Sequence, residues 1–167
     1  MLYTLGGIVA VCTSPVGGIP KFPQSKVQIG QWGFEGDFHN REMRQSFSKP
    51  GIFKTNVDRH ITIVGFEVIE DLNRELNLTL APGSLGENIT TKGLGDLSEI
   101  KDRTILQVGQ EGILLRVIEQ NQPCHNLAPL HRLLVKKIYG RRGLLCAILS
   151  GVGKTLEPNL PIFVYQT

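Results

Sequence analysis

Short runs of β-type residues, separated by glycine, proline, asparagine and aspartate, occur along almost the whole chain and constrain its fold most strongly. Some of these runs are continuously apolar and others alternate apolar with polar residues, the two patterns typical of strands. We expect strands at residues 7–13, 27–32, 60–64, 88–91, 104–108, 112–118, 144–149 and 161–165. Because closure leaves no unpaired edge, this pattern predicts a mainly β fold, a closed or nearly closed β-barrel.

Two segments have the period of a helix. Residues 66–76 place Phe66, Ile69 and Leu72 on one face, and residues 130–138 repeat the pattern just before Gly140. The barrel is therefore expected to carry two or more short helices. The stretch from Glu35 to Val57 fits neither period and is long for a structureless loop, so we expect it to be either functional or mobile.

Composition limits the classes of protein to which the chain can belong. A length of 167 residues with 41% hydrophobic residues fits one globular domain, which we expect to span residues 1–167. A net charge of +3 is too small to indicate a nucleic-acid partner. The apolar N-terminus has no basic leader and is broken by proline and glycine, so we expect no membrane segment and a cytoplasmic location.

The three cysteines lie in different surroundings. They are too few for a disulfide framework, which suits a reducing compartment. Cys12 and Cys146 lie inside apolar β runs, where cysteine acts as a small buried hydrophobic residue. Cys124 follows Pro123 in a polar segment at the end of a strand-like run. Such a position suits a nucleophile or a ligand for a soft metal, although a loop cysteine without a role fits the local residues equally well.

Two basic motifs call for alternative interpretations. Residues 151–155 resemble the end of a phosphate-binding P-loop, but Ile148 stands where the first glycine is required, so we expect a turn between two strands. Residues 131–142 contain two pairs of basic residues. A solvated helix face is the favoured interpretation, and a cationic rim that attracts an anion such as a phosphate is the alternative.

Four sequence blocks, in order, resemble the MOSC domain, the module at the C-terminus of molybdenum cofactor sulfurases that also occurs as small free-standing proteins. The blocks are residues 7–21, 33–39, 82–90 and 117–125, and the resemblance extends from about Gly6 to Val164. The Gly-Glu-Asn sequence that ends at Asn88, followed by Pro-Cys at Cys124, is its most specific part.

The resemblance implies a β-barrel with a pocket for the molybdenum cofactor, a pterin that carries a phosphate and a dithiolene-bound metal. In this family the cysteine that matches Cys124 either ligates molybdenum or carries a persulfide sulfur. Lysine and arginine suit the phosphate, whereas asparagine and carboxylates suit the pterin edge. The expected cofactor-binding residues are Lys21, Asp37, His39, Arg59, Gly86, Glu87, Asn88 and His125, with Cys124 as the catalytic residue and metal ligand.

Three functions follow from the resemblance. The first is a molybdenum-cofactor-binding protein, a small oxidoreductase that acts on N-hydroxylated substrates with electrons from an external electron-transfer protein. The second is a sulfur carrier that receives a persulfide on Cys124 from a pyridoxal-phosphate-dependent cysteine desulfurase. The third is a non-catalytic binding module, which draws on a departure from the family: residues 47–52 replace a His-Gly-Gly motif found in many relatives.

Overall fold

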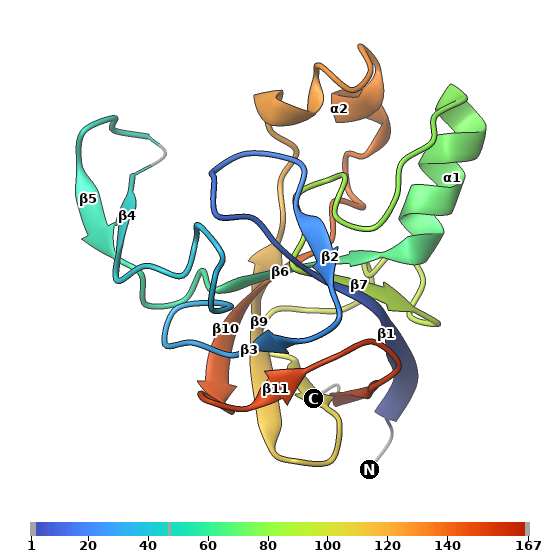
Figure 1. Cartoon of the computed structure of the whole chain (residues 1–167). Coiled ribbons are helices and arrows are strands. Elements are labelled where there is room, and N and C mark those ends of the chain that lie inside the picture. Colours follow the sequence, from blue (N-terminus) through green and yellow to red (C-terminus); the bar gives the residue numbers. More distant parts are fainter. Residues whose placement is uncertain (1–2, 47, 166–167) are drawn as a thin grey trace.

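Seven strands form a closed barrel (Figure 1). The computed structural model describes residues 3–46 and 48–165. The barrel order is β12-β8-β9-β10-β6-β7-β1, and β12 closes it by pairing with β1. The barrel strands are β1 (Tyr3–Thr13), β6 (Ile61–Gly65), β7 (Ile89–Lys92), β8 (Ile105–Val108), β9 (Ile113–Gln120), β10 (Leu144–Ser150) and β12 (Pro161–Tyr165).

The mainly β barrel predicted from the sequence is confirmed, and seven of the eight predicted runs contribute its seven strands. The eighth prediction, a strand at residues 27–32, is wrong beyond its first residues. Only β3 (Val27–Gln28) is a strand there, paired outside the barrel with β11 (Thr155–Leu156). The Gly30 N–H donates to the carbonyl of Gly33, which turns the chain and places Phe34 in the core.

A helical crossover joins two neighbouring strands of the barrel. β6 and β7 are the parallel pair, and α1 (Phe66–Leu76) connects them, as parallel strands require a crossover. The helix has the bounds predicted from its period, and it buries Val68, Ile69 and Leu72. It ends at Asn77, whose left-handed backbone (φ 52°) turns the chain back toward the barrel.

The predicted second helix is much shorter than expected. Only α2 (Leu134–Lys137) is α-helical within residues 130–138, and a 3₁₀ turn, η1 (His125–Leu127), precedes it. The Leu130 N–H donates to the Leu127 carbonyl, three residues back, so the chain continues in tight turns through Pro129 before α2 begins.

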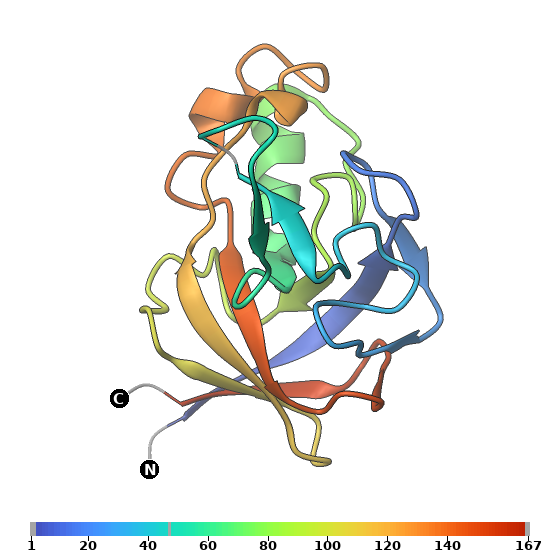
Figure 2. The same ribbon diagram turned by 90° about the vertical axis from the view of Figure 1, so that its left-hand side faces the viewer.

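The stretch from Glu35 to Val57 contains a small hairpin rather than a structureless loop. Its strands are β4 (Met43–Gln45) and β5 (Phe53–Thr55), and the hairpin stands beside the upper end of the barrel (Figures 1 and 2). Of the divergent segment 47–52, Phe47 lies outside the described residues. A further short strand, β2 (Phe22–Gln24), extends the sheet beyond β1.

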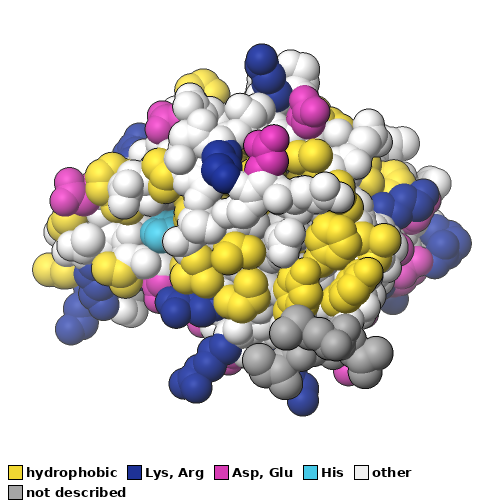
Figure 3. Space-filling model, turned by 90° about the horizontal axis from the view of Figure 1, so that it is seen from below, with side chains coloured by type: hydrophobic (Ala, Val, Ile, Leu, Met, Phe, Trp, Pro, Cys, Tyr) yellow, Lys and Arg dark blue, Asp and Glu magenta, His cyan; other side chains and the backbone are white. Residues whose placement is uncertain are grey.

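Two apolar clusters hold these elements together. One fills the barrel and includes Phe34, Leu106 and Leu115. The other lies between the barrel and the helices, where Leu72 and Leu85 meet Leu127. At the lower end of the barrel, away from the two helices, apolar side chains gather on the surface (Figure 3). No helix in the described part of the chain has the length and apolar character needed to cross a membrane.

Candidate functional site

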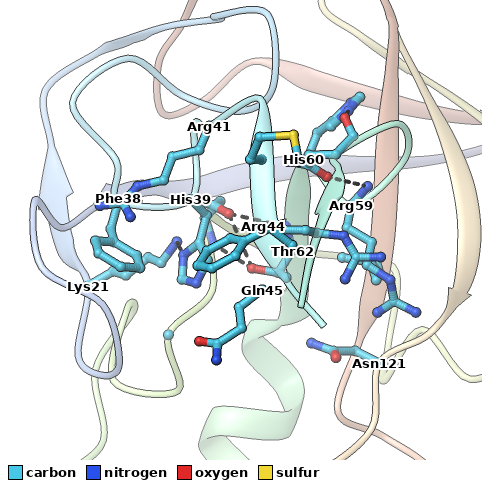
Figure 4. A pocket seen from close by; sticks show the side chains of 16 residues that line it. Lys21, Phe38, His39, Arg41, Arg44, Gln45, Arg59, His60, Thr62 and Asn121 are labelled. Atoms are coloured by element: carbon cyan, nitrogen blue, oxygen red, sulfur yellow. Dashed lines mark hydrogen bonds between the residues drawn. The ribbon is translucent and has the colours of Figure 1, made fainter. Parts of the chain in front are cut away.

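A cleft opens at the upper end of the barrel, between its strand ends and the β4–β5 hairpin. It consists of two adjoining cavities of about 500 and 560 Å³, a size typical of sites for small molecules and cofactors. His39, Arg44, Arg59, Gly86 and Asn121 line both of them. Figure 4 shows the first cavity, with Lys21, Phe38 and His39 on one side and Arg59 and Asn121 on the other.

The cleft is strongly cationic. Its lining includes six lysine or arginine side chains, but among the described residues only one carboxylate faces it, that of Glu119. Glu119 is engaged in an ion pair with Arg59 (2.5 Å). Such an excess of positive charge favours an anionic ligand. The six side chains are Lys21, Arg41, Arg44, Lys54, Arg59 and Arg142.

Lys21, Asp37 and His39, three of the predicted site residues, meet at one wall of the cleft. The Lys21 ammonium donates to Oδ2 of Asp37 (2.7 Å) and lies 3.3 Å from Nδ1 of His39. The side chains of Lys21 and Asp37 are only 3% and 1% exposed, so this is a buried ion pair. The second oxygen of Asp37 accepts the N–H of Ser14 (2.9 Å), which ties the loop after β1 to the pair.

Opposing effects act on the two charges of this pair. Burial alone would raise the pKa of Asp37, but contacts with His39, Lys21 and Ser14 hold it well below its ordinary value near 3.8. Burial lowers the pKa of Lys21, while the charge of Asp37 opposes that change. Because Asp37 already neutralises Lys21, the lysine is a weaker anion ligand than its position in the sequence suggests.

The Gly-Glu-Asn block forms the turn that precedes β7, and its members have different surroundings. Gly86 lines both cavities with φ at +83°, and a side chain there would collide with Ile19. Glu87 is fully buried and accepts from the N–H groups of Gly83 (2.7 Å) and Leu85 (3.2 Å). Glu87 thus shapes the turn and lines neither cavity, which does not support its expected contact with the pterin.

Asn88 is a buried connector that also faces the first cavity. Its side-chain oxygen accepts from the N–H and hydroxyl of Thr62 in β6, and its amide donates to the Cys12 carbonyl in β1 (3.2 Å). These bonds join three strands at the floor of the cleft. The amide side chain is therefore fixed in orientation before any ligand arrives.

Cys124 lies in the second cavity, at the residue that precedes the η1 turn. It is partly exposed, unlike the other two cysteines, and shares the cavity with Arg59, Asn121 and Arg142. His125, the first residue of the 3₁₀ turn, is exposed and lines neither cavity. The structure therefore brings Cys124 to the cleft and leaves His125 outside it.

Arg142 is a site residue that the sequence indicated only through the alternative interpretation of residues 131–142 as a cationic rim. Within the basic stretch 131–142, Arg141 forms ion pairs with Asp71 and Glu75 on the helical side of the molecule, with its side chain 19% exposed. Arg142 is instead 6% exposed, lines the cavity of Cys124 and donates to the carbonyl of Leu85. Burial lowers the pKa of its guanidinium, and the nearby Glu87 and Cys124 oppose that change.

Cys12 and Cys146 are fully buried, as predicted. Burial raises the pKa of Cys12 to about 12 and that of Cys146 further, so neither thiol is a nucleophile near neutral pH.

We expect Cys146→Ser to lower the free energy of unfolding by about 1–3 kcal/mol, because the hydroxyl would lie in an apolar core without a partner. Urea denaturation measures the change, and Cys12→Ser is expected to behave similarly. A Cys146→Ser variant as stable as the parent would mean that the core supplies a hydrogen-bond partner.

The described residues contain no group of three histidine, cysteine or carboxylate side chains that could hold a metal ion by themselves. The cleft offers one thiol, several cations and fixed amide groups. It is suited to an anionic ligand with polar edges that meets the protein at a single sulfur.

The protein is thus a closed β-barrel with a cationic cleft and one partly exposed thiol in it, and comparison with known families identifies its class. The family model of the MOSC domain matches residues 36–151. The chain therefore belongs to the MOSC domain family.

Solved structures agree on the fold. The chain is similar to the YuaD protein of Bacillus subtilis (TM-score 0.86, 19% identity), with 99% of each chain covered. It is also similar to YiiM from Geobacillus stearothermophilus (TM-score 0.70, 21% identity), with 96% of this chain and 75% of that one covered. For YiiM from Escherichia coli the TM-score is 0.65 and the identity 20%, with 100% of this chain and 71% of that one covered. No curated protein matches the chain significantly by sequence.

Proposed function

We propose that this protein binds the molybdenum cofactor in the cationic cleft, with Cys124 as the protein ligand of the metal. The observation that carries the proposal is the position of Cys124. It is the partly exposed cysteine of the chain, and it lies in a cavity lined by Arg44, Arg59 and Arg142. A thiolate suits a soft metal, and the surrounding cations suit a cofactor that carries a phosphate.

The residues of the cleft fit the polar parts of such a cofactor. Arg59 is the expected phosphate ligand with the more open side chain, 38% exposed; it pairs with Glu119 (2.5 Å), so a phosphate would compete with that carboxylate. The amide groups of Asn88 and Asn121 face the first cavity, where they can hydrogen-bond to a pterin edge. Phe38 and His60 provide flat surfaces in the same cavity. Lys21 and Asp37 hold the wall formed by the loop after β1.

When bound, the cofactor supplies a redox-active metal that can remove an oxygen atom from an N-hydroxylated substrate, with two electrons and two protons consumed and water released. The protein would contribute the thiolate of Cys124, the anchoring cations and the walls of the cleft. The electrons come from an external electron-transfer protein under this proposal.

Metal and pterin analysis tests the proposal directly. The protein is expressed in a host that synthesises the cofactor, and we expect about one molybdenum and one pterin per chain. Folded, freshly isolated protein that contains neither would contradict the proposal.

A sulfur carrier is the second candidate, favoured by the same exposed thiol. Here the Cys124 thiolate attacks the outer sulfur of a desulfurase persulfide, takes that sulfur, and releases the desulfurase cysteine as a thiolate. Mass spectrometry after incubation with a pyridoxal-phosphate-dependent desulfurase and cysteine distinguishes the two. A gain of one sulfur on Cys124 in protein that lacks molybdenum favours the carrier. If the protein contains no molybdenum and gains no sulfur, that result favours a non-catalytic binding module.

A further inference from the structure

The guanidinium of Arg142 is buried with most of its hydrogen-bonding capacity unused. Nη2 donates to the carbonyl of Leu85, whereas Nε and Nη1 have no partner among the described residues. A buried charged donor without a partner is costly, and native structures rarely retain one without a reason.

The backbone around Arg142 holds it in this position. Gly143, which follows it, has φ at +92°, and a side chain there would lie 1.9 Å from the Ile63 carbonyl. The chain thus passes tightly against β6 just before β10 begins. Arg142 thus lies beside the turn that contains Leu85, to whose carbonyl it donates.

Nearby protein groups do not complete the coordination of Arg142. The Glu87 carboxylate lies close enough to influence its charge, but that carboxylate is occupied by the N–H groups of Gly83 and Leu85 and the hydroxyl of Thr90. The cavity that Arg142 lines contains further cations and one carboxylate, that of Glu119, which pairs with Arg59. One of these cations, Arg44, also has a buried Nε without a partner in the described part of the chain.

We propose that Arg142 anchors an anion-binding subsite beside Cys124, which takes an oxyanion group such as a phosphate. The subsite deepens the proposed function by naming one anchoring residue, and it rests on that function where the anion is the phosphate of the cofactor. The oxyanion group belongs either to a bound cofactor, as its phosphate, or to a small anionic substrate. An oxyanion accepts from the unused donors of Arg142 and neutralises the excess charge of the cavity.

Protection of Cys124 from alkylation tests the subsite in cofactor-free protein. Inorganic phosphate is the probe, with sodium chloride at equal ionic strength as the control, and peptide mapping follows the iodoacetamide labelling of Cys124. Because Arg142 and Cys124 line one cavity, we expect saturating phosphate to slow the labelling several-fold more than chloride does. Equal rates in phosphate and chloride would overturn the proposal.

Two substitutions assign the effect to Arg142. Arg142→Gln is expected to weaken phosphate protection about tenfold or more, as for the loss of a charge-assisted hydrogen bond. Arg132→Gln removes one exposed charge outside the cleft and is expected to keep the parental protection. Arg142→Lys keeps the charge but loses hydrogen-bond donors, so weaker phosphate protection of Cys124 is expected in this variant too. It replaces Arg142→Gln if that variant does not fold. Unchanged protection in a folded Arg142 variant would overturn the proposal.

Calorimetric titration with phosphate distinguishes the two sources. Loss of phosphate binding in cofactor-loaded protein would mean that the subsite holds the phosphate of the cofactor. Binding retained in loaded protein would mean that it serves a free anionic substrate. Both results support the subsite. Because the protection experiment uses cofactor-free protein, its failure is separate from a failure to find molybdenum.

Discussion

Replacing Asp37 with asparagine is expected to lower the free energy of unfolding by about 3–5 kcal/mol, because it leaves a buried ammonium without its counter-charge. Lys21 is 3% exposed and donates to Asp37 at 2.7 Å. The asparagine amide would also place a donor against the Lys21 ammonium or the Ser14 N–H, both of which now face carboxylate oxygens. Urea denaturation of both proteins at neutral pH measures the loss.

Two comparisons show that the pair itself is responsible. Asp102→Asn removes an exposed carboxylate and is expected to change the stability by less than about 0.5 kcal/mol. Lys21→Met combined with Asp37→Asn should be less destabilising than the sum of the single changes, since the double variant leaves no unpaired charge. Additive losses would show that Lys21 and Asp37 do not stabilise one another.

The same pair predicts an acid dependence. The folded protein holds the pKa of Asp37 below its ordinary value near 3.8. The contribution of Asp37 to the free energy of unfolding is therefore fully present above about pH 4 and is lost progressively as the pH falls below that value toward the lowered pKa. The stability difference between the parent and Asp37→Asn should therefore shrink below about pH 4. Denaturation midpoints at several pH values measure it. A difference that stays constant down to pH 3 would contradict this assignment.

The barrel was predictable because its signals are local. A period of two in β-branched and apolar residues identifies a strand without knowledge of its partner, and seven of the predicted runs are the barrel strands. Residues 27–32 show the limit of that signal. Their alternation is real, since Val27 and Ile29 are buried in the same apolar cluster as the barrel strands, but such burial needs no long pairing with another strand.

The site depends on contacts between distant residues, which a single sequence does not display. Lys21 and Asp37 are far apart along the chain, so each is predicted as a free ligand although they neutralise one another. Arg141 and Arg142 are neighbours of the same residue type, yet one pairs with Glu75 and the other lines the cleft. The nearest available signal is position: Arg142 and Gly143 directly precede a mostly apolar strand, where the chain enters the barrel.

The exposure of Cys124, in contrast to the burial of the other two cysteines, could be predicted because it depends on the neighbouring residues in the sequence. Cys12 and Cys146 stand among aliphatic residues that predict burial, and both are buried. The polar segment around Cys124 predicts exposure at a strand end, and the structure places it one turn after β9 in the cleft. His125 belongs to the same polar segment but does not line the cleft. In a tight turn neighbouring side chains point in different directions, so polarity alone does not identify the residue that faces the cleft.

Changing Cys124 to serine is expected to abolish function while leaving the fold almost unchanged. A hydroxyl is a poor ligand for a soft metal and cannot carry a persulfide, so both the cofactor-binding protein and the sulfur carrier lose the chemistry of this position. Cys124 is partly exposed, so the substitution buries no new unpartnered group, and stability should change by less than about 0.5 kcal/mol. Molybdenum content per folded chain, persulfide formation and urea denaturation are measured on the same preparation.

Selective labelling provides an independent check of this residue. In the native parent, iodoacetamide should label Cys124 first, because burial raises the pKa of both Cys12 and Cys146 and shields them from the reagent. Native Cys124→Ser should label hardly at all until it is unfolded in urea, when the two buried thiols become accessible. If Cys12 or Cys146 in the native parent reacts as fast as Cys124, or if Cys124→Ser retains molybdenum or accepts sulfur as well as the parent does, the chemistry belongs elsewhere in the chain.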